Sequence, residues 1–396
     1  MPLSIEDLQK PVNPLADDYR HFRVADRLLL TGHSHQAWPD CAFSAQQQAW
    51  LDAAEYVDDK WALAAEKADQ VKAGFARLLN EPAADIALGQ NTHELVLRFL
   101  SALDLNARPR LITTDSEFHT LRRQLNRLKE TGVELVVVPQ VPMQSLAGRI
   151  IDAMDDSTAA VMVSQVFFNS GRIFADLPAV AEAANRKGIP LLVDVYHALN
   201  VVPVDVQAMG LVQAFIVGGG YKYCQLGEGN CFLRVPPGCD WRPVNTGWYA
   251  EFALLESSHG DQVQYGKGAA AFAGSTYDPT SHYRAAAVFD FFQQRALTPA
   301  LLRQISQHQT GVLLDCFDAL NLPETIGPDR AMAREERAGF LVLDTEWAQA
   351  LSAGLKQRGV LTDARGRSLR FGPAPYLSDH QLYEAMQALA EAWRAL

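Results

Sequence analysis

Two short apolar runs in the middle of the chain each lead into a charged residue. Residues 191–193 are followed by Asp194, and residues 214–217 are followed by three glycines, Tyr221 and Lys222. Apolar runs of this length, bounded by turn residues, are typical of buried strands. Ligands of open α/β sheets bind beyond the carboxyl ends of the strands. We therefore expect Asp194 and Lys222 to face one crevice from neighbouring strand ends.

Similar runs recur along the chain and alternate with helical patterns. Strand-like runs occupy residues 86–89, 111–114, 133–139 and 159–163, and helical spacing is seen at 42–79, 121–131 and 281–295. This alternation predicts an α/β fold with a mostly parallel, doubly wound sheet. A chain of 396 residues is long enough for more than one domain. We expect an N-terminal segment (1–40) that contributes to a small domain and to the mouth of the site, a large domain (41–285) and a smaller C-terminal α/β domain (286–396).

Composition and charge argue against several classes of protein. The net charge of -11 is unlike that of a nucleic-acid-binding protein, whose affinity depends on clustered Lys and Arg. No stretch approaches the roughly 18 apolar residues of a membrane span. The first residues lack a basic region followed by an apolar one, so we expect a cytoplasmic enzyme. The five cysteines are scattered without a C-x-x-C pair, which argues against a disulfide framework or a zinc site.

Asp194 and Lys222 form the pairing that pyridoxal phosphate (PLP) requires. A lysine amine forms a Schiff base with this cofactor, and a carboxylate keeps the pyridinium nitrogen protonated so that the ring can accept electrons. Either residue alone is common in α/β proteins, so the argument depends on the pair. The local pattern D-x-x-H (Asp194, His197) followed by Y-K-Y (221–223) resembles the fold type I PLP-dependent enzymes of the class V aminotransferase group, and most of all kynureninase.

The resemblance implies PLP as cofactor and assigns roles to these residues. Lys222 would hold the cofactor and act as the base for the α-proton, and Asp194 would contact the ring nitrogen. Tyr221 and His197 would orient the ring or serve proton transfer. The fold implied is that of PLP-dependent transferases of fold type I, with a large sheet domain and a smaller C-terminal domain.

The resemblance also implies further cofactor contacts. Thr92 and His93 begin a helix after the strand at 86–89, where free backbone N–H groups favour a phosphate, although an ordinary helix N-cap is an alternative interpretation. Phe118 stands where the family stacks a side chain on the PLP ring. Ser164 and Gln165 both stand near the position of the PLP 3-oxygen, and Gln165 is included in the predicted cofactor set.

Two later positions imply a second subunit. Trp248 lies in Gly-Trp-Tyr, which resembles the kynureninase Gly-Trp-Phe segment, and Thr276 occupies the place of another phosphate contact. In the family both groups reach the cofactor of the other subunit. The resemblance therefore implies a homodimer with shared active sites.

The partner implied is a small-molecule amino-acid substrate, with no nucleic acid and no membrane. Arg370 resembles the family arginine that holds the α-carboxylate through two parallel hydrogen bonds. Ser34 and His35 would contact substrate at the mouth of the site. Residues 33–36 read His-Ser-His-Gln where the family has Asn-Ser-Leu-Gly, and Asp58-Asp59 stand where kynureninases carry a histidine. We predict no metal site at His33 and His35, since no partner carboxylate is nearby.

These residues lead to one expected activity with alternatives. A kynureninase-like enzyme hydrolyses the Cβ–Cγ bond of kynurenine or 3-hydroxykynurenine to an anthranilate and alanine. A class V aminotransferase or a β-lyase would use the same base and electron sink. A cysteine desulfurase is disfavoured because no cysteine stands between Cys316 and Arg370. A PLP-binding protein without catalysis is disfavoured by the intact Lys222 and Asp194.

Overall fold

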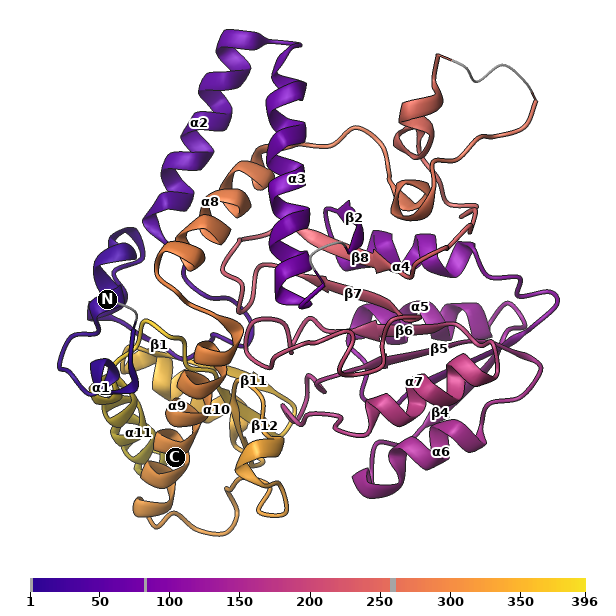
Figure 1. Ribbon diagram of the computed structural model, residues 1–396. Coiled ribbons are helices and arrows are strands. Elements are labelled where there is room, and N and C mark those ends of the chain that lie inside the picture. Colours follow the sequence, from indigo (N-terminus) through magenta and orange to yellow (C-terminus); the bar gives the residue numbers. More distant parts are fainter. Residues whose placement is uncertain (1–2, 82–83, 257–260) are drawn as a thin grey trace.

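A seven-stranded sheet forms the centre of the computed structural model, which describes residues 3–81, 84–256 and 261–396. Its strand order is β2-β8-β7-β6-β5-β3-β4 (Figure 1). The strands are β2 (Asp85–Gly89), β3 (Arg110–Thr114), β4 (Glu134–Val138), β5 (Thr158–Ser164), β6 (Leu191–Asp194), β7 (Phe215–Gly219) and β8 (Cys231–Val235). Strand β8 is antiparallel to both neighbours, and the other pairings are parallel. The predicted α/β fold with a mostly parallel, doubly wound sheet is confirmed.

Both faces of the sheet are buried. Successive strand residues point to opposite sides, so neighbouring residues enter different apolar clusters. Leu111 and Leu192 pack into one apolar cluster, whereas the adjacent Ile112 and Val193 pack into the other. The helices around the sheet are α3 (Lys60–Leu78), α4 (Thr92–Ser101), α5 (His119–Lys129), α6 (Leu146–Asp152) and α7 (Leu177–Arg186). Such two-sided burial explains why the strands read as continuous apolar runs.

The helical pattern at 42–79 forms two helices that project from the body of the molecule as a hairpin (Figure 1). Helix α2 (Asp40–Tyr56) is followed by its C-cap Val57, whose positive φ of 50° is one that β-branched residues rarely adopt. Asp58 and Asp59 therefore lie in the turn at the tip of the hairpin. Helix α8 (Thr280–Gln294) packs along both α2 and α3 and crosses the expected domain boundary at residue 285.

The smaller unit contains a three-stranded antiparallel sheet, ordered β11-β12-β9. Its elements are α9 (Pro299–Ala319), β9 (Leu341–Asp344), α10 (Ala348–Gln357), β10 (Val360–Leu361), β11 (Asp363–Arg365), β12 (Ser368–Phe371) and α11 (Asp379–Arg394). From the N-terminal segment, β1 (Leu28–Leu29) pairs in parallel with β10. The N-terminal segment, which also holds the short α1 (Ile5–Leu8), thus lies beside the C-terminal elements (Figure 1).

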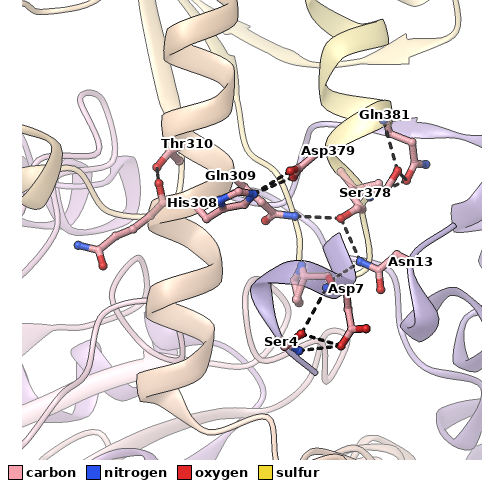
Figure 2. A network of polar contacts seen from close by, with 12 residues as sticks. Ser4, Asp7, Asn13, His308, Gln309, Thr310, Ser378, Asp379 and Gln381 are labelled. Carbon is pink, nitrogen blue, oxygen red and sulfur yellow. Dashed lines mark hydrogen bonds and ion pairs between the residues drawn. The ribbon is translucent and has the colours of Figure 1, made fainter. Parts of the chain in front are cut away.

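Asn13 fixes this N-terminal segment to the C-terminal elements. Its amide donates to the backbone oxygen of Leu377 at 3.0 Å, and Gln309 of α9 donates to the same oxygen at 3.2 Å. Beside Gln309, the ring of His308 contacts Asp379 at the start of α11 at 2.9 Å (Figure 2). Burial of these polar groups is tolerated because each one has a hydrogen-bond partner. None of the helices in the described ranges combines the length and apolar character that a membrane span needs.

Candidate active site

The carboxyl ends of β3, β5, β6 and β7 open onto one cleft of 1020 Å³. Seven of the predicted site residues line it: Thr92, His93, Phe118, Asp194, His197, Tyr221 and Lys222. They come from four separate stretches of the chain and meet because parallel strands end at the same edge of the sheet. The structure therefore brings the predicted lysine, carboxylate and aromatic side chains together.

Lys222 follows β7 and is buried in the floor of this cleft. Its Nζ lies 2.7 Å from His197 Nε2 and 4.5 Å from the ring centre of Tyr196. Burial lowers the pKa of Lys222 to about 7, and the charge of Asp194 opposes this shift. A substantial fraction of the amine is thus unprotonated near neutral pH, as a nucleophilic lysine requires.

His197 is held neutral by the same surroundings. Burial, and then the charge of Lys222, places the pKa of His197 well below its usual value. Its Nδ1 is buried without a hydrogen-bond partner. A buried polar atom of this kind is expected where a ligand completes the site.

Asp194 is the last residue of β6, and its Oδ1 accepts a hydrogen bond from Tyr196 N–H at 2.8 Å. Burial raises the pKa of Asp194, while the Tyr196 N–H and Lys222 act in the opposite direction. Phe118 lines the cleft from the end of β3 and packs edge-on against Phe168 at 5.3 Å. An aromatic face and a carboxylate in one cleft match the needs of a planar, nitrogen-containing ring.

The N-terminus of α4 also faces the cleft. Asn91 caps it, accepting a hydrogen bond from Glu94 N–H and donating to the Glu94 carboxylate, both at 3.0 Å. The cap interpretation is thus correct for Asn91, but this cap does not use the N–H groups of Thr92 and His93. Those groups lie at the positive end of the helix dipole, where an anion is favoured.

Arg370 of β12 is buried next to the cleft residues and is already engaged. Its Nη1 donates to the Phe168 carbonyl at 2.9 Å, and its Nη2 forms an ion pair with Asp363. Asp363 faces Arg370 because β11 and β12 pair in antiparallel register. The Nε of Arg370 is buried without a partner. Arg370 thus keeps donor capacity for a further anion.

Asp363 was missed from the sequence, as was the environment of His33. His33 is fully buried, stacks on Phe340 at 4.7 Å, and its Nε2 lies 3.5 Å from Asp363 Oδ2. Burial lowers the pKa of His33 to about 4. The signal for Asp363 was the short hairpin with Gly366 at its turn, which places residue 363 opposite residue 370. Among the described residues no group of three or more His, Cys, Asp or Glu side chains is arranged to hold a metal ion.

Ser34 and His35 lie at the rim of the site. The Ser34 hydroxyl is 3.1 Å from His35 Nδ1, and the His35 ring stacks on Tyr221 at 4.9 Å. Neither residue lines the cleft itself, whereas Tyr221 does. His35 therefore extends the aromatic wall that Tyr221 begins.

Ser164 and Gln165 point in different directions, as neighbours in a strand do. Ser164 lines the cleft, and its hydroxyl contacts Glu117 at 2.5 Å. The Gln165 amide instead lies 3.9 Å from the sulfur of Met209, and Gln165 is not among the cleft residues. Of these two residues, Ser164 is therefore the one that faces the cleft.

Trp248 and Thr276 do not line the cleft of their own chain. Trp248 Nε1 donates to Thr276 Oγ1 at 3.2 Å, so these two predicted residues do meet each other. Trp248 belongs to the 3-10 helix Trp248–Leu254 and is 43% exposed. Thr276 lines a second cleft of 760 Å³ with Thr246 and Gly247.

The sheet, with a buried lysine and a carboxylate in one cleft at its carboxyl edge, has the layout of a PLP-dependent enzyme of fold type I. The family model for class V aminotransferases matches residues 53–370, and the chain belongs to this family.

Similar proteins carry several different names. An uncharacterized aminotransferase, YcbU of Bacillus subtilis, is 23% identical over 92% of this chain and 96% of its own length. A kynureninase of Burkholderia mallei is 28% identical over 62% of this chain and 59% of its own length.

Solved structures share the fold. A C-DES mutant with glycine covalently linked to its PLP cofactor has a TM-score of 0.82 at 14% identity, covering 96% of this chain and 99% of that one. The Escherichia coli cysteine desulfurase CsdA has a TM-score of 0.74 at 17% identity, covering 100% and 99%.

Proposed function

We propose that this chain is a PLP-dependent enzyme that hydrolyses the Cβ–Cγ bond of kynurenine or 3-hydroxykynurenine, giving an anthranilate and alanine. The observation that carries the proposal is the position of Lys222 and Asp194 in one cleft, beyond the ends of neighbouring strands and beside aromatic walls. Similarity to kynureninase over 261 residues supports this reaction. Tyr221 and His35 would accommodate the aryl group of such a substrate.

The residues of the cleft fit the cofactor. The N–H groups of Thr92 and His93 would hold its phosphate, Phe118 would cover a ring face, and Asp194 would hold a proton at the ring nitrogen. Lys222 Nζ would be the point of covalent attachment. When bound, PLP supplies an electron sink for the bond broken at the amino acid.

The chain's own residues would then position the substrate and move its protons. Arg370 would bind the α-carboxylate, using donors that Asp363 and the Phe168 carbonyl leave free. Lys222 Nζ would accept the Cα proton, and His197 Nε2, 2.7 Å away, can exchange a proton with it. Tyr221, at the open side of the cleft, would serve the proton transfer that hydrolysis at the γ-carbonyl needs.

We also propose that two copies of the chain complete each site. Trp248 and Thr276 are hydrogen-bonded to each other on the surface, away from the cleft of their own chain. An exposed tryptophan beside a polar partner is suited to reach across an interface. The two residues would then contact the cofactor phosphate of the partner subunit.

A substrate comparison tests the reaction. Purified holoenzyme is incubated with kynurenine and with 3-hydroxykynurenine, and alanine and the corresponding product, anthranilate or 3-hydroxyanthranilate, are measured. Equimolar release of both products is expected, and Lys222→Ala should abolish it. Purified protein that takes up no PLP would overturn the cofactor assignment.

Transamination or β-elimination is the second candidate. A relative that matches 92% of the chain is named as an uncharacterized aminotransferase, and the mouth sequence His-Ser-His-Gln departs from the kynureninase pattern. Formation of pyridoxamine phosphate from other amino acids, with no alanine from either kynurenine, would favour transamination. Release of pyruvate and ammonia from a β-substituted amino acid would favour the lyase.

A further inference from the structure

Glu117 is a buried carboxyl group behind the cleft to which the proposed reaction assigns no role. It lies between β3 and α5, immediately before Phe118, and is 1% exposed. Its Oε1 accepts hydrogen bonds from Thr114 Oγ1 at 2.6 Å and from Ser164 N–H at 3.2 Å. Its Oε2 lies 2.5 Å from Ser164 Oγ. Both carboxyl oxygens are therefore fixed by neutral partners.

These contacts connect residues that line the cofactor cleft. Ser164 ends β5 and stands in register with Asp194 on β6. Phe118 follows Glu117 directly and forms part of the cleft wall. Glu117 therefore ties the end of β5 to the turn that carries the aromatic face.

The charges around Glu117 favour its protonated form. Among the described residues Glu117 forms no ion pair with a cation, and the carboxylate of Asp194 acts on it electrostatically. The nearby cation, Lys222, interacts with Asp194. Burial raises the pKa of Glu117 to about 7, and the Asp194 charge adds to this effect. An isolated carboxylate is costly in such a place, whereas a neutral acid is not.

We propose that Glu117 is a positioning residue that carries a proton up to neutral pH, holding Ser164 and Phe118 in place and leaving Asp194 as the charged carboxylate at the cofactor ring. In this form the Glu117 hydroxyl donates to Ser164 Oγ, and the other oxygen accepts from Thr114 and from Ser164 N–H. Two carboxyl groups in one region thus take different protonation states, as their environments require. The inference rests on the proposed function only in placing the cofactor in this cleft.

Glu117→Gln imitates the protonated acid. The amide oxygen can accept from Thr114 and Ser164 N–H, and the amide nitrogen can donate to Ser164 Oγ, so each contact is retained. Glu117→Ala removes them all. Glu182→Gln on the exposed face of α7 is a matched control, because it makes the same chemical change where the side chain forms a surface ion pair with Arg186.

Stability as a function of pH tests the protonation state. The folded-state pKa is raised, so stability is fully present below the unfolded value of about 4.5 and is lost as pH rises toward about 7. A shift of this size predicts that the folding equilibrium constant of the native chain falls by up to about 300-fold relative to Glu117→Gln between pH 4.5 and 8. Glu182→Gln should follow the native chain at every pH. Thermal midpoints of each protein across this range give the comparison without any use of catalysis.

Cofactor binding tests the positioning role. The visible absorption of bound PLP and its dissociation constant should be close to native in Glu117→Gln, whereas Glu117→Ala should bind PLP at least about tenfold more weakly. If Glu117→Ala does not fold, the spectrum and affinity of Glu117→Gln decide. A Glu117→Gln protein with the pH profile of the native chain, or with altered PLP absorption and affinity, would show that the carboxylate is the working form. The thermal unfolding midpoints test the protonation state of Glu117 even if the enzyme proves to be a transaminase or takes up no PLP.

Discussion

Replacing Asp363 by Asn should destabilise the protein by about 2–3 kcal/mol at neutral pH. Arg370 is buried, and Asp363 is its anionic partner; its other recorded acceptor, the Phe168 carbonyl, is neutral. Unit charges about 4 Å apart attract by roughly 4 kcal/mol at an effective dielectric constant of about 20. Loss of one partner of a buried ion pair costs about 3–5 kcal/mol. Asp363 keeps 21% of its side-chain surface exposed, so solvent screening places the expected cost below that range.

The exposed pair Arg367–Asp344 provides the control. It also joins an arginine near β12 to an aspartate in the small sheet, with side chains 60% and 63% exposed. Asp344→Asn makes the same chemical change, and its effect should be much smaller because water screens exposed pairs. Thermal and urea unfolding of both variants at pH 7.5 gives the comparison.

The pH dependence is a second test of the same pair. Burial alone would raise the pKa of Asp363, but His33 and Arg370 hold it well below its usual value. Because the folded-state pKa is depressed, the stabilisation is present above about pH 4 and is lost as pH falls further. The difference in stability between the native protein and Asp363→Asn should therefore become smaller below about pH 4. Equal stability of Asp363→Asn and Asp344→Asn at pH 7.5 would refute the reasoning.

Three further outcomes are expected. The rate at which cofactor-free protein takes up PLP, followed by visible absorption, should rise about tenfold per pH unit up to about pH 7 and then level off, because the pKa of Lys222 is lowered to about 7; a rate that is flat between pH 5 and 7 would contradict this. Arg370→Lys should raise KM for the amino acid about 10–100-fold, with a smaller change in kcat, because a lysine cannot form two parallel hydrogen bonds to a carboxylate; an unchanged KM in steady-state kinetics would exclude the assigned role. Mixing equal amounts of inactive Lys222→Ala and Trp248→Ala subunits should restore about a quarter of native activity, because about half of the dimers are then mixed and each mixed dimer has one intact site out of two. No recovery of activity after subunit exchange would argue against shared sites.

Positions at strand ends could be predicted because a buried parallel strand has a simple sequence signature. Asp194 and Lys222 each follow an apolar run at a short distance, so the shared edge of the sheet was enough to bring them together. The partners of these residues could not be read in the same way. Asp363 meets Arg370 only through the register of an antiparallel hairpin. Glu117 meets Ser164 only because β3 and β5, 40 or more residues apart, are adjacent in the sheet.

The prediction of helix boundaries was limited by local backbone conformation and by weak hydrophobic patterns in the sequence. The break after α2 requires a positive φ at the β-branched residue Val57, which sequence propensity disfavours. The long helices α9 and α11 were not predicted individually, although both are amphipathic and pack on each other. Among neighbouring residues, Ser164 and Gln165 could be separated only once the strand phase was known, since alternate side chains face opposite sides.

The attachment of the N-terminal segment to the C-terminal elements has a consequence for biosynthesis. The hydrogen bond from Asn13 to Leu377 spans 364 positions, and β1 pairs with β10 near the other end of the chain. On a ribosome the first forty residues therefore emerge long before their partners, and loop closure over this distance is slow. The large sheet can assemble while β1 is still unpaired. The rim of the site that holds Ser34 and His35 should therefore form late, once the C-terminal elements have been synthesised.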